Sequence, residues 1–388
     1  ASKHVKVKYV DPNVSPTFAS KYTDNDVTSN SIIVVCGDRS KVIDYNSDIY
    51  EYSYDSSYNY SVTGYDCEGQ VTAAIQYVTS ESTTNVYELT GHDESTLSGD
   101  FSEVFQKRFM NVGSLSLLTV DAIPEDCQAI FITAPQSDLS EDDLSKLSQY
   151  LGNGGKIYLS IDYSKWNDLT NFKKLLSDNN IETTESLLAE TDRSYYYQSP
   201  FYLLPNVENT EVSSSVAGMT QVFVPYSVGL TYTGEDDSNV TSFMTTSDTT
   251  IAKAAANIAA VQSQADAANI ASAQDGDTQG QYSLGMMVTN ENGGELCVLG
   301  SAMMCTDSAN QIVSGHNATL FNGIVNALVT TDDGNSDNAV VIAAKDYTVS
   351  NLTVSANAML VYGILWGIFM PIALIIIGII VWARRRKR

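Results

Sequence analysis

The chain has 388 residues and a formal net charge of −25, from 46 acidic and 21 basic side chains. An acidic field of this size repels phosphate backbones, so nucleic acid is excluded as an expected partner. Acidic surfaces also keep proteins soluble, and solubility alone explains the charge without any ligand.

Cysteine usage excludes two further kinds of site. The five cysteines are odd in number, widely scattered and without C-x-x-C spacing, so they predict neither a disulfide framework nor a zinc site. Most are expected to be small core residues, and the members of any single disulfide cannot be assigned. The cysteines are Cys36, Cys67, Cys127, Cys297 and Cys305.

Residues 1–82 predict a small N-terminal α/β domain. His4–Val10 alternates as a strand does, and Ser31–Cys36 is an apolar run typical of a buried strand. Gln70–Thr79 has helical spacing. The sequence opens on the strand-like segment without an initiator methionine, so we expect that a signal peptide or another membrane span preceded it.

A tyrosine-rich stretch lies inside this domain. Seven tyrosines fall between Tyr45 and Tyr65, and Tyr50, Tyr52 and Tyr54 recur at every second position. Side chains with that spacing share one face of an extended segment. Such a face can stack on sugars or contact a partner, and a half-exposed sheet surface explains it equally well without a ligand.

Residues 83–200 alternate strands and helices, which predicts a parallel sheet covered by helices, a doubly wound layout of the flavodoxin or glutamine-amidotransferase kind. Ser140 is followed by three acidic residues, which predicts a capped helix start at this position. The glycines of Gly152–Gly155 predict the end of the same helix. The predicted strands are Val86–Leu89, Leu115–Val120, Ala129–Thr133 and Lys156–Ile161, and the predicted helices are Leu97–Arg108 and Ser140–Leu151.

Residues 201–357 are less regular and predict a β-rich continuation with mixed α/β elements. An Ala-rich insertion at 251–280 predicts a peripheral helix or a mobile segment over Ile251–Ala273. Asn317–Val329 has apolar residues at helical spacing and predicts a helix. The predicted strands are Gln221–Val228, Tyr282–Thr289, Glu295–Ala302 and a pair within Val340–Val354.

Residues 358–383 predict one transmembrane helix. Met359–Trp382 is a run of 24 residues with almost unbroken apolar character. About 20 such residues are enough to cross a bilayer core. Trp382 suits the headgroup level at the end of the span, and Pro371 is expected to kink the helix because it removes one backbone donor.

Five cations follow the span directly in residues 384–388. Positive flanks stay on the cytoplasmic side, where anionic lipid also attracts them. We therefore expect a cell-membrane protein with a single-pass C-terminal helix, a cytoplasmic C-terminus and a large extracytoplasmic part. The predicted bilayer contacts are Trp382, Arg384, Arg385, Arg386, Lys387 and Arg388.

One candidate ligand site follows the strand Val86–Leu89. Parallel sheets bind ligands beyond the carboxyl ends of their strands, and His92, Asp93 and Glu94 lie there. A histidine beside two carboxylates can transfer protons or hold a cation. Turn chemistry explains the same cluster without a ligand.

Known catalytic signatures are missing from the sequence. The strand-to-helix turn at Phe131–Ser137, where an amidotransferase-like hydrolase needs its nucleophile, has no cysteine and no G-x-S-x-G pattern. Gly154-Gly155-Lys156 is followed by Ile157, so it is not a phosphate loop, and no H-E-x-x-H or Gly-rich dinucleotide turn occurs. We therefore expect a protein that is not an enzyme, with no catalytic, cofactor-binding or metal-ligating residues.

Several segments, in their order along the chain, resemble one family. They are VKVKYVDPNVSPTFASKY near the start, QVTAAIQYVT with VYELTGHDE, IPEDCQAIFITAPQSDLSEDDLSKLSQYLGNGGKIYLSID, GGELCVLGSAMM, SGHNATLFNGIVNAL and the closing WARRRKR. Together they are similar to the GldG-like auxiliary components of ABC-2 type transporters, a bacterial family named for gliding motility. The Ala-rich insertion has no clear counterpart in that pattern.

The resemblance implies a non-catalytic extracytoplasmic subunit of an ABC-type transport system that binds the permease or the transported substrate. It implies an amidotransferase-like central domain without that chemistry, and permease and ATPase subunits as partners. Two alternatives stay open: a membrane-anchored surface hydrolase or amidase using His92 and Glu94, and a carbohydrate-binding surface protein using the tyrosine face. The transported substrate, its direction and the stoichiometry stay open as well.

Overall fold

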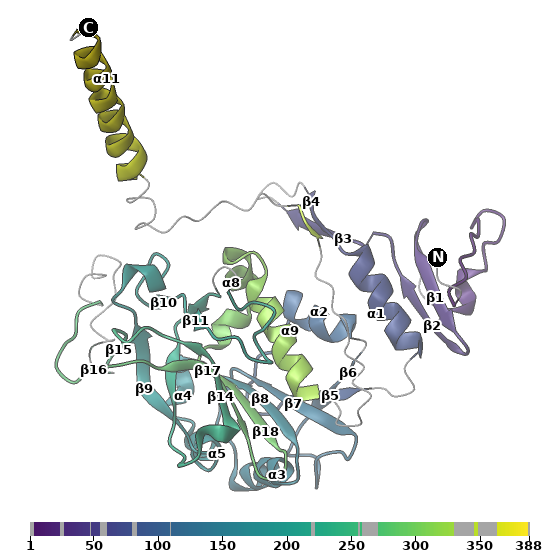
Figure 1. Cartoon of the computed structure of the whole chain (residues 1–388). Coiled ribbons are helices and arrows are strands. Elements are labelled where there is room, and N and C mark those ends of the chain that lie inside the picture. The colour runs from purple at the N-terminus through teal and green to yellow at the C-terminus, as the bar shows by residue number, and fades with distance from the viewer. Residues whose placement is uncertain are drawn as a thin grey trace. The chain divides into compact units, whose positions relative to one another are not determined.

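The computed structural model describes residues 4–23, 27–46, 48–54, 60–79, 84–108, 110–218, 222–254, 257, 271–329, 345–347 and 363–386. The chain separates into two compact units, Ala1–Thr348 and Val349–Arg388. The first unit is a mixed α/β structure, and the described part of the second is a helix (Figure 1).

A sheet of 12 strands forms the centre of the first unit. Five neighbouring strands are parallel and follow the order β6-β5-β7-β8-β18. Numbered along the chain, this is the order 2-1-3-4-5 of flavodoxin-like doubly wound sheets. Their bounds are β5 Asn85–Leu89, β6 Asn111–Leu115, β7 Cys127–Thr133, β8 Lys156–Ser160 and β18 Glu295–Leu299.

The other strands extend this sheet in antiparallel fashion from β18 through β17. They are β9 Ile181–Ala189, β11 Asn206–Val207, β13 Val228–Tyr232, β14 Val240–Thr245, β15 Ile251–Ala252, β16 Thr278–Gln279 and β17 Ser283–Thr289. A separate two-stranded sheet pairs β10 Tyr202–Leu203 with β12 Val224–Pro225. The predicted strand Gln221–Val228 is therefore divided between β12 and β13, because Tyr226 between them has a left-handed backbone with φ of 51°.

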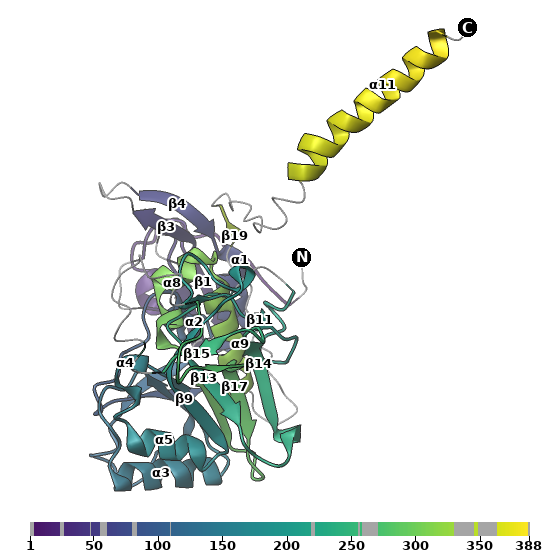
Figure 2. The same cartoon turned by 90° about the vertical axis from the view of Figure 1, so that its left-hand side faces the viewer.

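Helices cover both faces of the parallel strands, as Figures 1 and 2 show. Apolar side chains of α2 Asp100–Lys107 and α9 His316–Val329 pack on one face, and those of α3 Glu141–Gly152 and α5 Thr170–Ser177 pack on the other. Strand β8 is buried on both faces for this reason, and its apolar run Ile157–Leu159 shows no exposed surface. Two shorter helices are α4 Tyr163–Trp166 and α8 Asp307–Ile312.

The predicted cap of α3 is confirmed. Ser140 Oγ accepts a hydrogen bond from the Asp143 amide, and the Asp143 carboxylate accepts one from the Ser140 amide. This capping box satisfies two backbone donors that a helix start leaves unpaired. Helix α2 begins later than predicted, at Asp100, after Gly99 with a φ of 55°.

The predicted strand Leu115–Val120 is wrong. The structure places the strand earlier, as β6 Asn111–Leu115, and the following residues form a turn. Strand β6 is a sheet edge that pairs only with β5, and its side chains at Asn111, Val112 and Ser114 are exposed. An edge strand with exposed positions lacks the apolar pattern by which buried strands are recognised.

The N-terminal part contains a hairpin, a helix and a second small sheet. Strands β1 Ile32–Cys36 and β2 Arg39–Ile43 pair with each other, and α1 Cys67–Thr79 packs on them through Ile43, Ile49 and Ala74. The second sheet follows the order β19-β4-β3. Its strands are β3 Tyr50–Tyr54, β4 Tyr60–Tyr65 and β19 Lys345–Asp346.

The predicted strand His4–Val10 is wrong, because these residues form no strand. Val5, Val7 and Tyr9 expose 54%, 76% and 94% of their surface, so the alternating pattern packs against nothing in the described structure. A strand needs a neighbour for its backbone hydrogen bonds, and periodicity alone does not supply one.

Some predicted elements lie largely outside the described residues. Of the Ala-rich segment Ile251–Ala273, the structure describes 251–254, 257 and 271–273, where Ile251 and Ala252 form β15. Of Val340–Val354 it describes 345–347, where β19 pairs with β4. The predicted helix Asn317–Val329 is confirmed as α9, and Tyr282–Thr289 and Glu295–Ala302 correspond to β17 and β18.

The described part of the second unit is a helix, Leu365–Arg386, which is 22 residues long and apolar enough to cross a membrane by length and composition. None of its apolar window is buried in the structure. It opens with a π-helical turn, Leu365–Phe369, and continues as α11 Met370–Arg386. The wide turn lies directly before Pro371, whose ring crowds the carbonyl of the preceding turn and removes one donor.

Candidate functional site

The strand order marks one position for a ligand in the parallel half of the sheet. Strands β6 and β7 lie on opposite sides of β5, so the order reverses there, and the loops after β5 and β7 meet at the carboxyl edge. Open α/β sheets bind ligands in the crevice at such a reversal. The predicted residues His92, Asp93 and Glu94 lie in the loop after β5.

The structure brings His92 and Glu94 together and adds a residue that the sequence did not indicate. His92 Nδ1 lies 3.0 Å from Glu94 Oε1, and His92 Nε2 lies 3.3 Å from Asp143 Oδ2 in the first turn of α3. All three side chains are at least 95% buried. The imidazole therefore cross-links the loop after β5 to α3 and has almost no contact with solvent.

Charge complementarity shifts the pKa of each member of this group. Burial alone would lower the pKa of His92, but its contacts with Glu94 and Asp143 outweigh burial and raise it above the ordinary value. Burial alone would raise the pKa of each carboxyl group, and the hydrogen bonds that they accept, including those from His92, lower it instead. The charged form of His92 and the charged forms of the two carboxylates beside it thus stabilise each other.

The loop after β7 closes over the same position. The amides of Gln136 and Ser137 donate to the carbonyl oxygen of His92 at 3.0 and 2.9 Å, and Ser137 Oγ donates to Asp93 Oδ2 at 2.8 Å. Asp93 itself has a left-handed backbone, with φ of 57°, and is exposed. The protein's own loop thus satisfies the His92 carbonyl and the Asp93 carboxylate, whereas Asp143 Oδ1 is buried without a hydrogen-bond partner in the described structure.

Strand β7 ends at a strained turn. Ala134 has a φ of 49°, and its amide donates to the Ser160 carbonyl at 2.9 Å. Gln136 Nε2 holds the turn by donating to the Ala134 carbonyl and to Asp162 Oδ2, both at 3.0 Å. The side chain at this strained position is a methyl group, which has no nucleophilic atom.

The tyrosine stretch packs partly onto itself. The Tyr50 ring lies 5.4 Å from the rings of both Tyr45 and Tyr65, and all three contact the apolar core around Ile43. A hydrogen bond with Tyr45, together with burial, raises the pKa of Tyr50 to about 12. The side chains of Tyr52 and Tyr54 lie outside the described part of the chain, so a shared face with Tyr50 stays a prediction.

A second aromatic cluster, which the sequence analysis missed, centres on Tyr226. The Tyr226 ring is stacked between Tyr163 at 5.7 Å and Phe201 at 6.1 Å, and Tyr202 meets it edge-on at 5.4 Å. In the sequence, the tyrosine-rich run Ser194–Pro205 was the feature that could have indicated this cluster. Only the tertiary fold brings Tyr163 and Tyr226 to that run.

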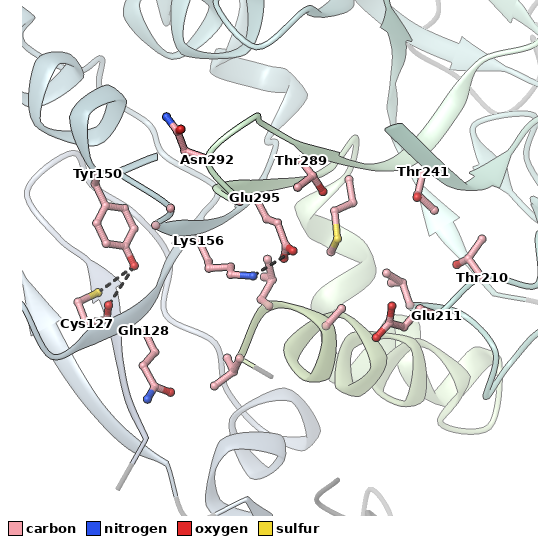
Figure 3. Close-up of a pocket in the computed structure, with 18 residues that line it drawn as sticks. Cys127, Gln128, Tyr150, Lys156, Thr210, Glu211, Thr241, Thr289, Asn292 and Glu295 are labelled. Atoms are coloured by element: carbon pink, nitrogen blue, oxygen red, sulfur yellow. Dashed lines mark hydrogen bonds and ion pairs between the residues drawn. The ribbon is translucent and has the colours of Figure 1, made fainter. Parts of the chain in front are cut away.

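A cavity with a volume of about 890 Å³ lies at the opposite, amino edge of the parallel strands. Strands β7, β8 and β18 begin beside it, at Cys127, Lys156 and Glu295 (Figure 3). Lys156 Nζ lies 3.0 Å from Glu295 Oε1. None of these residues was predicted as a site, because Glu295 lies 139 positions after Lys156 and no local pattern joins the two.

Cys127 is the one thiol beside this cavity among the residues that line it. Its Sγ lies 3.5 Å from the Tyr150 hydroxyl, and burial raises the pKa of the thiol to about 11. The reactive thiolate is therefore scarce at neutral pH. All five cysteines, including Cys127, are free rather than disulfide-bonded.

No group of three metal-ligating side chains in the described residues is placed to hold a metal ion. Each ring nitrogen of His92 lies within hydrogen-bonding distance of a carboxylate. Neither nitrogen therefore offers a free lone pair to a metal ion.

The predicted bilayer contacts lie at the end of α11. The Arg386 guanidinium carbon lies 5.2 Å from the centre of the Trp382 ring, and Arg384 and Arg385 occupy the same last turn. Lys387 and Arg388 lie outside the described residues. A cation over an indole is a favourable pair at a membrane interface.

No family model and no curated protein matches the chain. Among solved structures, the mmIFT52 N-terminal domain is similar at 17% identity and a TM-score of 0.45, over 64% of this chain and 98% of that one. The exo-beta-1,4-mannosidase Op5Man5 from Opitutaceae bacterium strain TAV5 is similar at 11% identity and a TM-score of 0.35, over 67% of this chain and 38% of that one.

PurLQS from Thermotoga maritima is similar at 11% identity and a TM-score of 0.32, over 64% of this chain and 100% of that one. At these identities and scores, the three similarities say nothing about the activity of this chain.

Proposed function

We propose that this protein is a non-catalytic, extracytoplasmic auxiliary subunit of an ABC-type transport system, similar to the GldG-like components. In this proposal α11 spans the membrane, the basic residues after Trp382 stay in the cytoplasm, and the first unit lies outside. The central domain is amidotransferase-like without the chemistry of that family, and it binds the permease or the transported substrate.

The observation that carries the proposal is the pairing of two features. Helix Leu365–Arg386 is apolar, unburied and ends in arginines, which suits a membrane anchor with a cytoplasmic end. At the carboxyl edge, His92 is held between two carboxylates, and Ala134 occupies the strained turn where a hydrolase would carry its nucleophile. A membrane anchor, combined with a carboxyl edge where His92 is held by the protein's own carboxylates, favours an accessory role over catalysis.

Topology is the first test. Cys36 is exposed in the first unit, so a membrane-impermeant maleimide should label it in intact cells with a permeable outer layer. The Cys36→Ser variant is the matched control, because it removes that thiol and leaves the anchor unchanged. Labelling of Cys36 only after lysis would place the first unit in the cytoplasm and reject the proposal.

Partnership is the second test. Full-length tagged protein, extracted in mild detergent, should co-purify with a multi-span permease and an ATPase. Because the role is accessory, deletion of the gene should impair transport while the ATPase still hydrolyses ATP. Repeated recovery of the chain alone, together with normal transport in the deletion strain, would remove the basis for the proposal.

A surface hydrolase is the alternative from another class, and the contact of His92 with Glu94 at the sheet reversal is the observation in its favour. It predicts that the double variant His92→Ala/Glu94→Ala abolishes an activity found by substrate screening. The 4% exposure of His92 opposes it, since a general acid or base must reach its substrate.

A further inference from the structure

The cavity at the amino edge of the parallel strands has the dimensions of a small-molecule site. Its volume is about 890 Å³. Ligand pockets usually occupy about 300–1,000 Å³. It lies on the face covered by α9, and the end of that helix, Ala327–Val329, forms part of its wall. The wall is therefore built from regular elements on at least two sides.

The polar groups of this cavity include acceptors that lack donors. One carboxylate oxygen of Glu295 pairs with Lys156, but the other, Oε2, is buried without a hydrogen-bond partner in the described structure. The amide oxygen of Gln128 is also buried without one. Gln128 is the extra residue of a β-bulge, because Asn85 and Val86 pair with Cys127 and Ala129. A bulge at such a position redirects a side chain out of the regular alternation.

The electrostatic balance of the cavity is negative. Among the described residues that line the cavity, Lys156 is the one cation, and it is already paired with Glu295. Glu211 is a second carboxylate on the wall and is exposed, and Figure 3 shows it across the cavity from the ion pair. The C-terminal end of α9, a helix of 14 residues, adds partial negative charge. The two carboxylates and the end of α9 disfavour anionic ligands and favour cations that carry hydrogen-bond donors.

Apolar side chains complete the wall. Val212, Met287 and Leu328 line the cavity and present methyl groups beside the polar ones. This combination fits a molecule with an alkyl segment and charged nitrogen donors at its ends, since the alkyl part displaces water from the methyl groups while the nitrogens supply hydrogen bonds.

We propose that this cavity binds a small organic cation, a primary amine or guanidinium compound with a short alkyl chain. Its charged nitrogen lies near Glu211 and the Glu295–Lys156 pair, and its alkyl chain lies against Met287. The site does not depend on the proposed transport role, and it is separate from the His92 cluster at the other edge of the sheet.

The test uses the full-length chain in detergent, labelled with [methyl-¹³C]methionine, and titrated with putrescine. The Met287 methyl signal, assigned with the Met287→Leu variant, should shift in a saturable manner. Calorimetry on the same sample should give a dissociation constant in the millimolar range or tighter. The uncharged counterpart 1,4-butanediol should leave the Met287 signal unchanged.

Matched variants separate the cavity from the general acidity of the surface. Glu211→Gln should weaken putrescine binding about fivefold, the size expected for one partly exposed charge pair. Glu235→Gln removes an exposed carboxylate that does not line the cavity, and it should have no effect. Both changes lie on exposed side chains, so an unchanged thermal transition should show that each variant is folded.

Three results would overturn the proposal. They are an unshifted Met287 signal at saturating putrescine, an equal loss of binding in both glutamate variants, and equal binding of 1,4-butanediol. None of them bears on co-purification with a permease, so failure here and failure of the transport proposal are distinguishable.

Discussion

Lys253 Nζ lies 2.7 Å from Asp277 Oδ2, and neither side chain exposes any surface. The two residues close the base of the Ala-rich insertion, next to the short pairing of β15 with β16. Asp277 also accepts hydrogen bonds from the amides of Ala254 and Gln274, and Lys253 donates to the Ser272 carbonyl. A buried ion pair needs such additional bonds to offset its loss of hydration.

Asp277→Asn should lower the free energy of unfolding by about 3–5 kcal/mol, because it leaves the Lys253 ammonium buried without a counter-ion. The double variant Lys253→Met/Asp277→Leu removes both charges and should recover part of the loss. Urea titration followed by the fluorescence of buried Trp166 measures both. Asp275→Asn, an exposed neighbour, is the control, and a loss of equal size in that variant would contradict the role of the pair.

The His92 cluster should give stability a defined pH window. Its carboxyl groups have lowered pKa values, so their contribution is present above the ordinary values of about 4 and is lost as pH falls through the folded-state pKa. The pKa of His92 is raised, so its contribution is present below about 6.5 and is lost as pH rises through the folded-state pKa. The stability difference between wild type and His92→Gln should thus be largest between those limits.

Ring ¹³C and ¹⁵N shifts of His92 check this directly, and they should titrate above pH 6.5. Substitution of His316, which lies at the start of α9, should distinguish its signals from those of His92 in the same spectra. A His92 ring that titrates below 6.5 would show that burial outweighs its two carboxylate partners.

Gly99 should tolerate no side chain. It has a φ of 55°, and an added Cβ would overlap the Asp307 carboxylate. Gly37→Ala is a matched control, because its φ is 58° and nothing lies within 4 Å of an added Cβ there. Gly37→Ala should cost only the left-handed backbone strain of about 1–2 kcal/mol. Gly99→Ala should cost more by at least about 1 kcal/mol, as measured by thermal unfolding, and equal costs would contradict the overlap.

Arg108 should hold α2 to α9 through neutral partners. Its guanidinium donates to the side-chain oxygens of Asn322 at 2.9 Å and Asn326 at 3.2 Å, and burial lowers the pKa of Arg108 to about 10. Arg108→Lys keeps the charge but loses the planar fork that reaches both amides. It should reduce stability by about 1–3 kcal/mol in urea titrations, and no change would show that the two amide contacts are dispensable.

Local signals in the sequence predicted the cap of α3 and the buried strand β7, but the strand predicted as buried at Ser31–Cys36 forms β1 with Val35 and Cys36 exposed. Ser140 with Asp143 three positions later is a helix start that can be read from four residues, and the apolar run Ala129–Thr133 is buried as a parallel strand must be. His4–Val10 was predicted as a strand from its alternation alone, and it failed because strand formation depends on a neighbouring edge that the sequence does not display.

The sites were less predictable because they depend on distant segments. Glu94 lies two positions from His92 and was found, whereas Asp143 lies 51 positions away and was not. The cavity beside Lys156 and Glu295 depends on the parallel pairing of β8 with β18, which no local pattern encodes. Gln128 reaches the cavity through a bulge, and bulges appear only when both paired strands are known.

That pairing of β8 with β18 also constrains how the chain folds. Residues 161–294 separate two strands that lie side by side, so the fifth parallel strand arrives only after the whole antiparallel half has been synthesised. Closing such a distant contact is slow, because the loop entropy is lost before any hydrogen bond is gained. Until then the edge of β8 is an unpaired, apolar template, and folding intermediates of this protein are expected to bind chaperones or to aggregate through it.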